Sequence, residues 1–154
     1  MSRLLFLIGL DIIVVGVCSA IVGFFAPRIP DRRLEGRRWP VPLMSWETVA
    51  FYRHLGVPWL TRVLPEAGGL FGGQSKSALP GSTREALVAY GREVRRAEWV
   101  HWLSSASALL TFLFNPWQLA LIFTAVVWAV NGLFIAVLRN NRLRIDKILD
   151  RSGA

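Results

Sequence analysis

Two long apolar runs, residues 4–25 and 117–138, constrain the fold of this chain more than any other feature of its sequence. Each run is 22 residues long, and an α-helix needs about 20 apolar residues to cross the hydrocarbon core of a bilayer. A shorter run of 16 residues, 99–114, contains His101 and several serines. The sequence has no strand-like alternation of polar and apolar residues. We therefore predict an all-α, integral membrane protein with about three transmembrane helices.

The distribution of charge predicts the orientation in the membrane. The chain has 154 residues, enough for one domain, and a formal net charge of +8. Residues 27–97 hold twelve of the eighteen Lys and Arg residues, and residues 139–154 hold five more. Because positive charge favours the cytoplasmic side, we expect this loop and the C-terminal tail in the cytoplasm and the N-terminus outside. Basic residues beside predicted spans favour lipid headgroups or a phosphorylated cofactor as partners, so we expect no nucleic acid.

The first apolar run can also be read as a secretory signal, because Arg3 precedes it and small residues follow Cys18. Signal cores are usually about 7–15 uninterrupted residues, whereas this run is longer and contains Asp11. We therefore expect a retained anchor helix rather than a cleaved segment. The single cysteine permits no intramolecular disulfide.

The long loop, residues 27–97, is predicted to be helical and partly interfacial. Within it, residues 45–55 have apolar side chains at helical spacing, with Ser45 as the expected N-cap and Gly56 as the stop signal. Trp59 follows in a second amphipathic piece, and its side chain suits the headgroup region of a bilayer.

Two further signals lie in the second half of this loop. A glycine-rich stretch, residues 68–73, is followed by Lys76 but matches neither the P-loop nor the dinucleotide fingerprint, so we expect a hinge or a lid. The sequence Ser82-Thr83-Arg84-Glu85 has the form of a capping box. It predicts a helix that runs from Thr83 into the shortest apolar run.

A block of charged residues before that run carries the strongest sign of chemistry. Glu98 and His101 are three residues apart, so they share a helix face and can form a general-base pair in which the carboxylate orients the imidazole. Glu93 and Arg96 form a second pair at the same spacing. The structural alternative is a set of ion pairs at a helix end, with His101 as an interfacial aromatic. Ser105 allows a covalent serine route, although serines are also common packing residues in membrane helices.

Two polar residues inside the predicted spans are candidates for contacts between helices. We expect Asn131 to hydrogen-bond across helices and to hold its span against the one that contains His101. Asp11 is an intramembrane acid and therefore a functional candidate. The alternatives for Asp11 are a packing acid paired with Asn131 and a carboxyl group that stays protonated.

A basic segment, Arg139-Asn140-Asn141-Arg142-Leu143-Arg144, follows the last apolar run. By the predicted topology it lies on the same side of the membrane as Glu98 and His101. It is either an ordinary stop-transfer cluster or an anion site for phosphate groups, in which Asn141 donates to an oxyanion.

A metal site is the rival chemistry for the charged block. Glu-x-x-His occurs in di-iron helical bundles, which need two such motifs and two further carboxylates. This chain has one such motif, at Glu98 and His101, and only His54 besides. We therefore expect no bound metal.

Together these pieces resemble the glycosyl-4,4'-diaponeurosporenoate acyltransferase family, small membrane proteins of staphyloxanthin-type carotenoid biosynthesis. The resemblance covers most of the chain, but Gly132 stands where the family pattern has proline and Asn140 where it has an aromatic residue. The matching elements are Arg28-Ile29-Pro30-Asp31, Glu93-x-x-Arg96-Ala97-Glu98-x-x-His101-Trp102, Asn115-Pro116, Asn131 and Arg139-x-Asn141-Arg142-x-Arg144.

The resemblance implies transfer of a fatty acyl group from an acyl thioester, either acyl-CoA or an acyl-carrier protein, to a hydroxyl of a glycosylated carotenoid or a related lipid. On that basis we assign His101 as the base and Glu98 as its orienting group, and we expect no cofactor to remain bound. The residues expected to bind substrate are Glu93, Arg96, Asn131, Arg139, Asn141, Arg142 and Arg144. The alternative is a non-enzymatic accessory subunit of a larger membrane complex. In either case a homo-oligomer or a membrane-protein partner suits so small a core.

Overall fold

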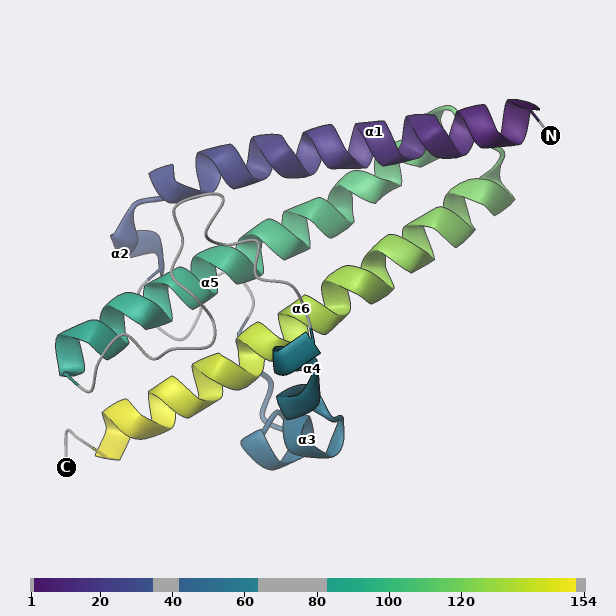
Figure 1. Ribbon diagram of the computed structural model, residues 1–154. Coiled ribbons are helices and arrows are strands. Elements are labelled where there is room, and N and C mark those ends of the chain that lie inside the picture. The colour runs from purple at the N-terminus through teal and green to yellow at the C-terminus, as the bar shows by residue number, and fades with distance from the viewer. Residues whose placement is uncertain (1, 35–41, 64–82, 152–154) are drawn as a thin grey trace.

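The computed structural model of the protein describes residues 2–34, 42–63 and 83–151. Every regular element in those ranges is a helix, which confirms the all-α prediction. Three long helices dominate the structure: α1 (Ser2–Phe25), α5 (Arg84–Ser107) and α6 (Trp117–Arg151). Helix α5 packs against both of the others and runs antiparallel to them (Figure 1). The short elements are η1 (Ala26–Arg28), α2 (Asp31–Leu34), α3 (Val49–His54), α4 (Val57–Val63) and η3 (Ala108–Leu113).

Two helical segments, Arg3–Arg28 and α6, are long and apolar enough to cross a membrane. The predicted third crossing over residues 99–114 is wrong, because no other helix in the described residues meets that requirement. The physical reason is the composition of α5. Its first half carries the charged block, so the apolar part that continues into η3 is too short to form an independent span.

Side chains of α6 stabilise the point where α5 changes into the 3-10 helix η3. The indole N–H of Trp128 donates to the backbone carbonyl of Ser105 at 2.8 Å, and the Thr124 hydroxyl donates to the carbonyl of Ala108 at 3.2 Å. Such a change of helix type releases backbone carbonyls that need new donors. The second half of α5 therefore packs on α6. Its small polar residues allow the two helices to approach closely.

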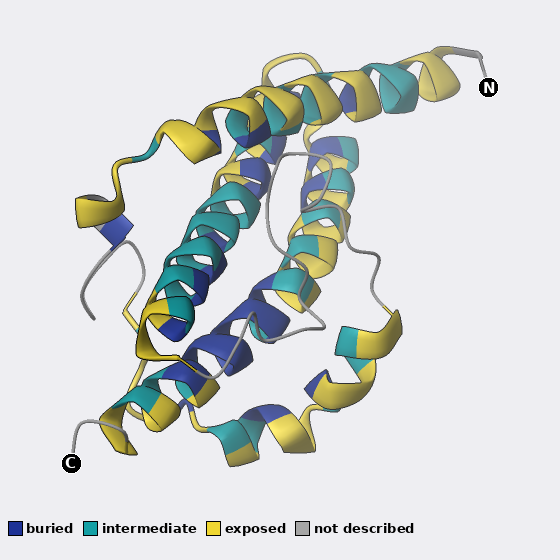
Figure 2. Cartoon of the chain, turned by 60° about the vertical axis from the view of Figure 1, so that its left-hand side comes forward, coloured by how far each residue is buried: buried dark blue, intermediate teal, exposed yellow. Residues whose placement is uncertain are grey.

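The charged ends of α5 and α6 form a packed core. Leu87, Tyr90 and Val94 of α5 are buried against Leu138 and Ile145 of α6. Figure 2 shows that buried residues gather on this part of the two helices. Helix α6 continues without a break to Arg151, so the basic segment predicted as a tail after the last span is helical and packed there.

The α3–α4 pair lies beside α6 (Figure 1). The expected N-cap at Ser45 is wrong: Thr48 caps α3, and its Oγ1 accepts from the backbone N–H of Phe51 at 3.1 Å. Gly56 ends α3 as predicted, and its φ of 73° is the left-handed conformation that glycine adopts at low cost. Because α3 is capped at Thr48, Glu47 lies just before the helix, and its side chain reaches Arg139 of α6.

The helix predicted to start at Thr83 is confirmed. The Oγ1 atom of Thr83 accepts from the backbone N–H of Ala86 at 3.3 Å and caps α5. The Ser82 position of the expected capping box, the glycine-rich stretch 68–73 and Lys76 lie outside the described residues.

A buried polar contact attaches α1 to the turn between η3 and α6. Asp11 is fully buried, and its Oδ1 accepts from Asn115 Nδ2 at 2.6 Å. The alternative partner suggested for Asp11, Asn131, is wrong. The reason is geometric, because Asp11 contacts the turn just before α6, whereas Asn131 lies fourteen residues after the start of α6, about 21 Å along the helix axis.

Candidate active site

His101 is held by a side chain of the facing helix. The distance from His101 Nδ1 to Asn131 Oδ1 is 2.8 Å, which confirms that Asn131 hydrogen-bonds across helices. Asn131 Nδ2 donates to the carbonyl of Val127 at 3.0 Å, and this bond fixes the amide so that its oxygen faces the imidazole. In the neutral ring Nδ1 therefore carries the proton, and Nε2 is the basic nitrogen. The imidazole also stacks on the Phe134 ring, with centroids 4.7 Å apart.

Glu98 does not take the orienting role that its spacing suggested. Its side chain is fully buried, and Oε2 accepts from Arg142 Nη1 at 2.7 Å. The other oxygen lies 3.4 Å from Arg139 Nε. The carboxylate is therefore directed at the arginines of α6, whereas His101 Nδ1 hydrogen-bonds to Asn131.

Glu47, just before α3, is a member of this buried group that the sequence did not reveal. Its carboxylate accepts from the backbone N–H of Met44 at 2.6 Å and from the Tyr52 hydroxyl, and it lies 3.2 Å from Arg139 Nε. Burial, together with the hydrogen bond to Glu47, raises the pKa of Tyr52. No local pattern marks Glu47, because its charged partner is far along the chain.

We call Glu47, Glu98, Arg139 and Arg142 the buried ion cluster. The two carboxylates and the two guanidinium groups balance, so the cluster has no net formal charge. Arg139 also donates to the carbonyl of Pro42 at 2.5 Å. Breaking such a balance inside a protein is costly, since it strands a charge. The cluster thus holds α5 and α6 together with the segment that leads into α3, and its guanidinium groups already lie beside carboxylates of the protein.

The remaining residues of the predicted binding set are spread along α6. Asn141 is buried, and its Nδ2 has no hydrogen-bond partner among the described residues. It lies ten residues after Asn131, or about 15 Å along the helix axis, too far to contact a carbonyl group attacked beside His101. Arg144 is exposed to solvent at the charged end of the helix.

Arg96 is directed away from His101, toward α2. It pairs with Glu93, as predicted, and its Nη2 lies 3.1 Å from Asp31 Oδ1. Arg92 lies 3.2 Å from the other oxygen of Asp31. Arg95 donates to the carbonyl of Leu34 at 2.8 Å, and burial is the main cause that lowers its pKa. These contacts attach α2 to α5.

The hydroxyl of Ser105 is also committed to the fold. It donates to the backbone carbonyl of His101 at 2.8 Å, and the side chain is buried. This geometry favours the packing interpretation of Ser105 over a covalent serine route.

Residues 30–151 match the family described as glycosyl-4,4'-diaponeurosporenoate acyltransferase. The chain belongs to this family. It is therefore an acyltransferase, and the family places it in carotenoid biosynthesis. No curated protein and no solved structure matches the chain significantly.

The family match covers three of the polar groups described above. These are the contacts of Asp31 with Arg96, the buried ion cluster, and the His101–Asn131 pair. Among them, the His101–Asn131 pair contains an imidazole, the side chain that most often acts as a general base. The geometry therefore makes this pair the centre of the candidate active site, and the ion cluster its support.

Proposed function

We propose that the enzyme transfers a fatty acyl group from an acyl thioester to a hydroxyl of a glycosylated carotenoid or a related membrane lipid. His101 is the general base. The observation that carries this proposal is the 2.8 Å contact between His101 Nδ1 and Asn131 Oδ1, because it leaves Nε2 as the proton acceptor.

The reaction needs one proton to move twice. Nε2 of His101 accepts the proton of the acceptor hydroxyl while its oxygen attacks the thioester carbonyl, so a C–O bond forms. The tetrahedral intermediate collapses, the C–S bond breaks, and the imidazolium returns the proton to the leaving sulfur. The Asn131 oxygen accepts from Nδ1–H throughout and stabilises the imidazolium, and the Phe134 ring fixes the plane of the imidazole.

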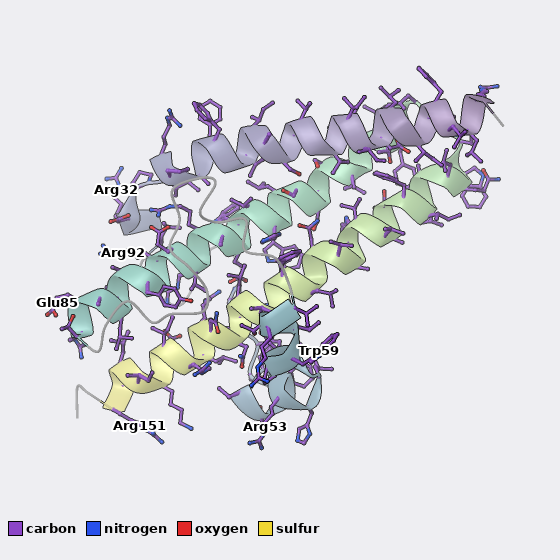
Figure 3. The ribbon with its side chains drawn as sticks, in the orientation of Figure 1. Arg32, Arg53, Trp59, Glu85, Arg92 and Arg151 are labelled. Atoms are coloured by element: carbon purple, nitrogen blue, oxygen red, sulfur yellow. The ribbon has the colours of Figure 1, made fainter. Side chains whose placement is uncertain are left out.

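The charged end of the helices suits the polar part of the acyl donor. Arg144 and Lys147 of α6 are exposed there, and Arg92 of α5 is partly exposed at the same end. A cluster of basic side chains attracts phosphate groups, which both acyl-CoA and an acyl-carrier protein contain. Figure 3 shows Arg32, Arg92 and Arg151 at this same end of the structure.

We place α1 and α6 in the bilayer, with their charged ends on the cytoplasmic side. Many large apolar residues on the two helices are exposed, and Figure 2 colours much of α1 as exposed, whereas the core helix of a soluble protein would bury such residues. Examples are Phe6, Ile13 and Phe24 of α1 and Ile122 and Val126 of α6. A membrane site also suits an acceptor that is itself a lipid.

The proposal is tested by reconstituting the purified chain in lipid vesicles that contain a glycosylated carotenoid. An isotope-labelled fatty acyl group is supplied on CoA or on acyl-carrier protein, and the extracted lipids are analysed by mass spectrometry. We expect a product heavier than the acceptor by one labelled acyl group with at least one of the donors. If neither donor labels any lipid in vesicles that contain the folded protein, the proposal fails.

A further inference from the structure

The α3–α4 pair and the residues beside it expose several large apolar side chains. Four residues make up this surface, which we call the α3–α4 face, and their exposed fractions are large: Trp46 60%, Leu55 56%, Trp59 63% and Val63 57%. Large apolar side chains gathered in this way on a short segment usually mark an interaction site.

The core does not account for the α3–α4 face. The inward side of the same pair already packs on α6, where Tyr52 and Val57 are buried against Val137, and Phe51 and Leu60 cover them. The segment therefore carries two apolar surfaces, one packed on α6 and one largely exposed, in which the Trp46 ring lies edge-on to Phe51 with centroids 5.0 Å apart.

The position of this segment along α6 points to a lipid partner. Val137, which α3 and α4 cover, comes two residues before the buried ion cluster begins at Arg139. Trp117, at the start of α6, lies twenty residues before Val137, or about 30 Å along the helix, which is the thickness of a bilayer core. The α3–α4 face thus lies at the level where the apolar length of α6 ends.

The residues of the segment suit a headgroup region. Trp is enriched at membrane–water interfaces, and the face contains two. Arg53, His54 and Arg62 of the same segment are exposed, so the segment is basic as well as apolar. Figure 3 shows Trp59 and Arg53 leaving the helix pair in different directions. Exposed apolar and exposed basic side chains on one segment are the properties of a helix that lies on an anionic membrane surface.

We propose that the α3–α4 face lies in the headgroup region of an anionic bilayer and sets the depth of the active site beneath it. This inference rests on the proposed placement of α1 and α6 in the membrane. Asn131 lies six residues before Val137, so the His101–Asn131 pair is about 9 Å deeper than the face. The acceptor hydroxyl must then be drawn below the headgroups, where water is scarce and acyl transfer competes well with hydrolysis.

Site-directed spin labelling tests the inference on the full chain. Cys18 is first replaced by alanine, and single cysteines are introduced as Trp59→Cys and Leu55→Cys in the face, Arg53→Cys as the matched control, and Leu133→Cys on the exposed side of α6. The labelled proteins are reconstituted in vesicles of phosphatidylcholine and phosphatidylglycerol. Collision rates with oxygen, which concentrates in lipid, and with a water-soluble nickel chelate then give the depth of each label.

We expect an oxygen-to-nickel ratio at positions 59 and 55 several-fold higher than at position 53 and lower than at position 133. If position 133 is in lipid but positions 59 and 55 are as accessible to nickel as position 53, the interfacial face is refuted and the proposed function stands. If position 133 is also open to nickel, the membrane placement fails and the inference fails with it.

Discussion

Removing the charge of Glu98 should destabilise the fold far more than its position in a charged block of α5 would suggest. The carboxylate is 0% exposed, accepts from Arg142 at 2.7 Å and lies 3.4 Å from Arg139. Glu98→Gln keeps the shape of the side chain but leaves the cluster with two buried guanidinium groups and the single carboxylate of Glu47, which lies beside Arg139. Loss of one partner from a buried ion pair costs about 3–5 kcal/mol.

Glu93 offers a matched control on the same helix. Its pair with Arg96 is partly exposed, and Arg96 retains a second partner in Asp31, so we expect Glu93→Gln to cost at most about 1 kcal/mol. The double variant Glu98→Gln/Arg142→Gln restores the balance of charge and should recover most of the loss caused by Glu98→Gln alone.

The assay is the free energy of unfolding of the purified protein, measured by denaturant titration in mixed micelles and followed by circular dichroism. A Glu98→Gln variant as stable as Glu93→Gln would refute the claim that the buried ion cluster stabilises the packing of α5 on α6. A double variant no more stable than Glu98→Gln would show that the lost stability comes from packing rather than from a stranded charge.

Four further predictions follow from individual contacts. Asn131→Leu should lower kcat by about 10- to 100-fold, because a hydrogen bond to a charged group contributes about 1.5–3 kcal/mol. Asn131→Asp can still accept from His101 Nδ1 and should retain turnover, so equal kcat values for the two variants would contradict the orienting role of Asn131. Because the pKa of Tyr52 is raised in the folded state, its contribution to the free energy of unfolding is fully present below pH ~10 and is lost as the pH rises further. Above that pH the wild type should lose up to about 1.4 kcal/mol per pH unit more than Tyr52→Phe, and parallel curves of unfolding free energy against pH would refute this. Asp11→Leu should cost about 1–2 kcal/mol because it removes the acceptor of the half-buried Asn115 amide, and an unchanged unfolding free energy would exclude that contact. Gly91→Ala should stabilise α5 by about 0.5–1 kcal/mol, because the new Cβ would lie 3.7 Å from Ile145, an ordinary contact; a loss of stability would mean that this interface has no room.

The long helices could be predicted from the sequence because their signals are local. The apolar run in α6 and the cap at Thr83 depend only on neighbouring residues. The third crossing was wrong because a count of apolar residues cannot tell a lipid-facing helix from one built to pack on another. That difference lies in contacts such as Trp128 with the Ser105 carbonyl.

The sequence predicted the contact of Asn131 across helices and the Glu93–Arg96 pair, but not the contacts of the buried ion cluster. Spacing on one helix placed Glu98 and His101 on a shared face, yet each finds its partner on α6: Arg142 for the carboxylate and Asn131 for the imidazole. Arg139, judged only by its neighbours in the sequence, suggested a stop-transfer charge or an anion site. Its partners, Glu47 and Glu98, come from distant parts of the chain, so only the tertiary structure reveals a balanced cluster.

The central claim is that His101 is the base of an acyl transfer, and the rate of His101→Gln in the vesicle assay tests it most directly. The chain has two histidines, so His54→Gln, on the exposed side of α3, is the matched control. General-base catalysis contributes about 100- to 10,000-fold. We predict that folded His101→Gln loses at least about 100-fold in kcat while His54→Gln keeps the wild-type rate. A folded His101→Gln enzyme that transfers the acyl group at the wild-type rate would contradict the mechanism.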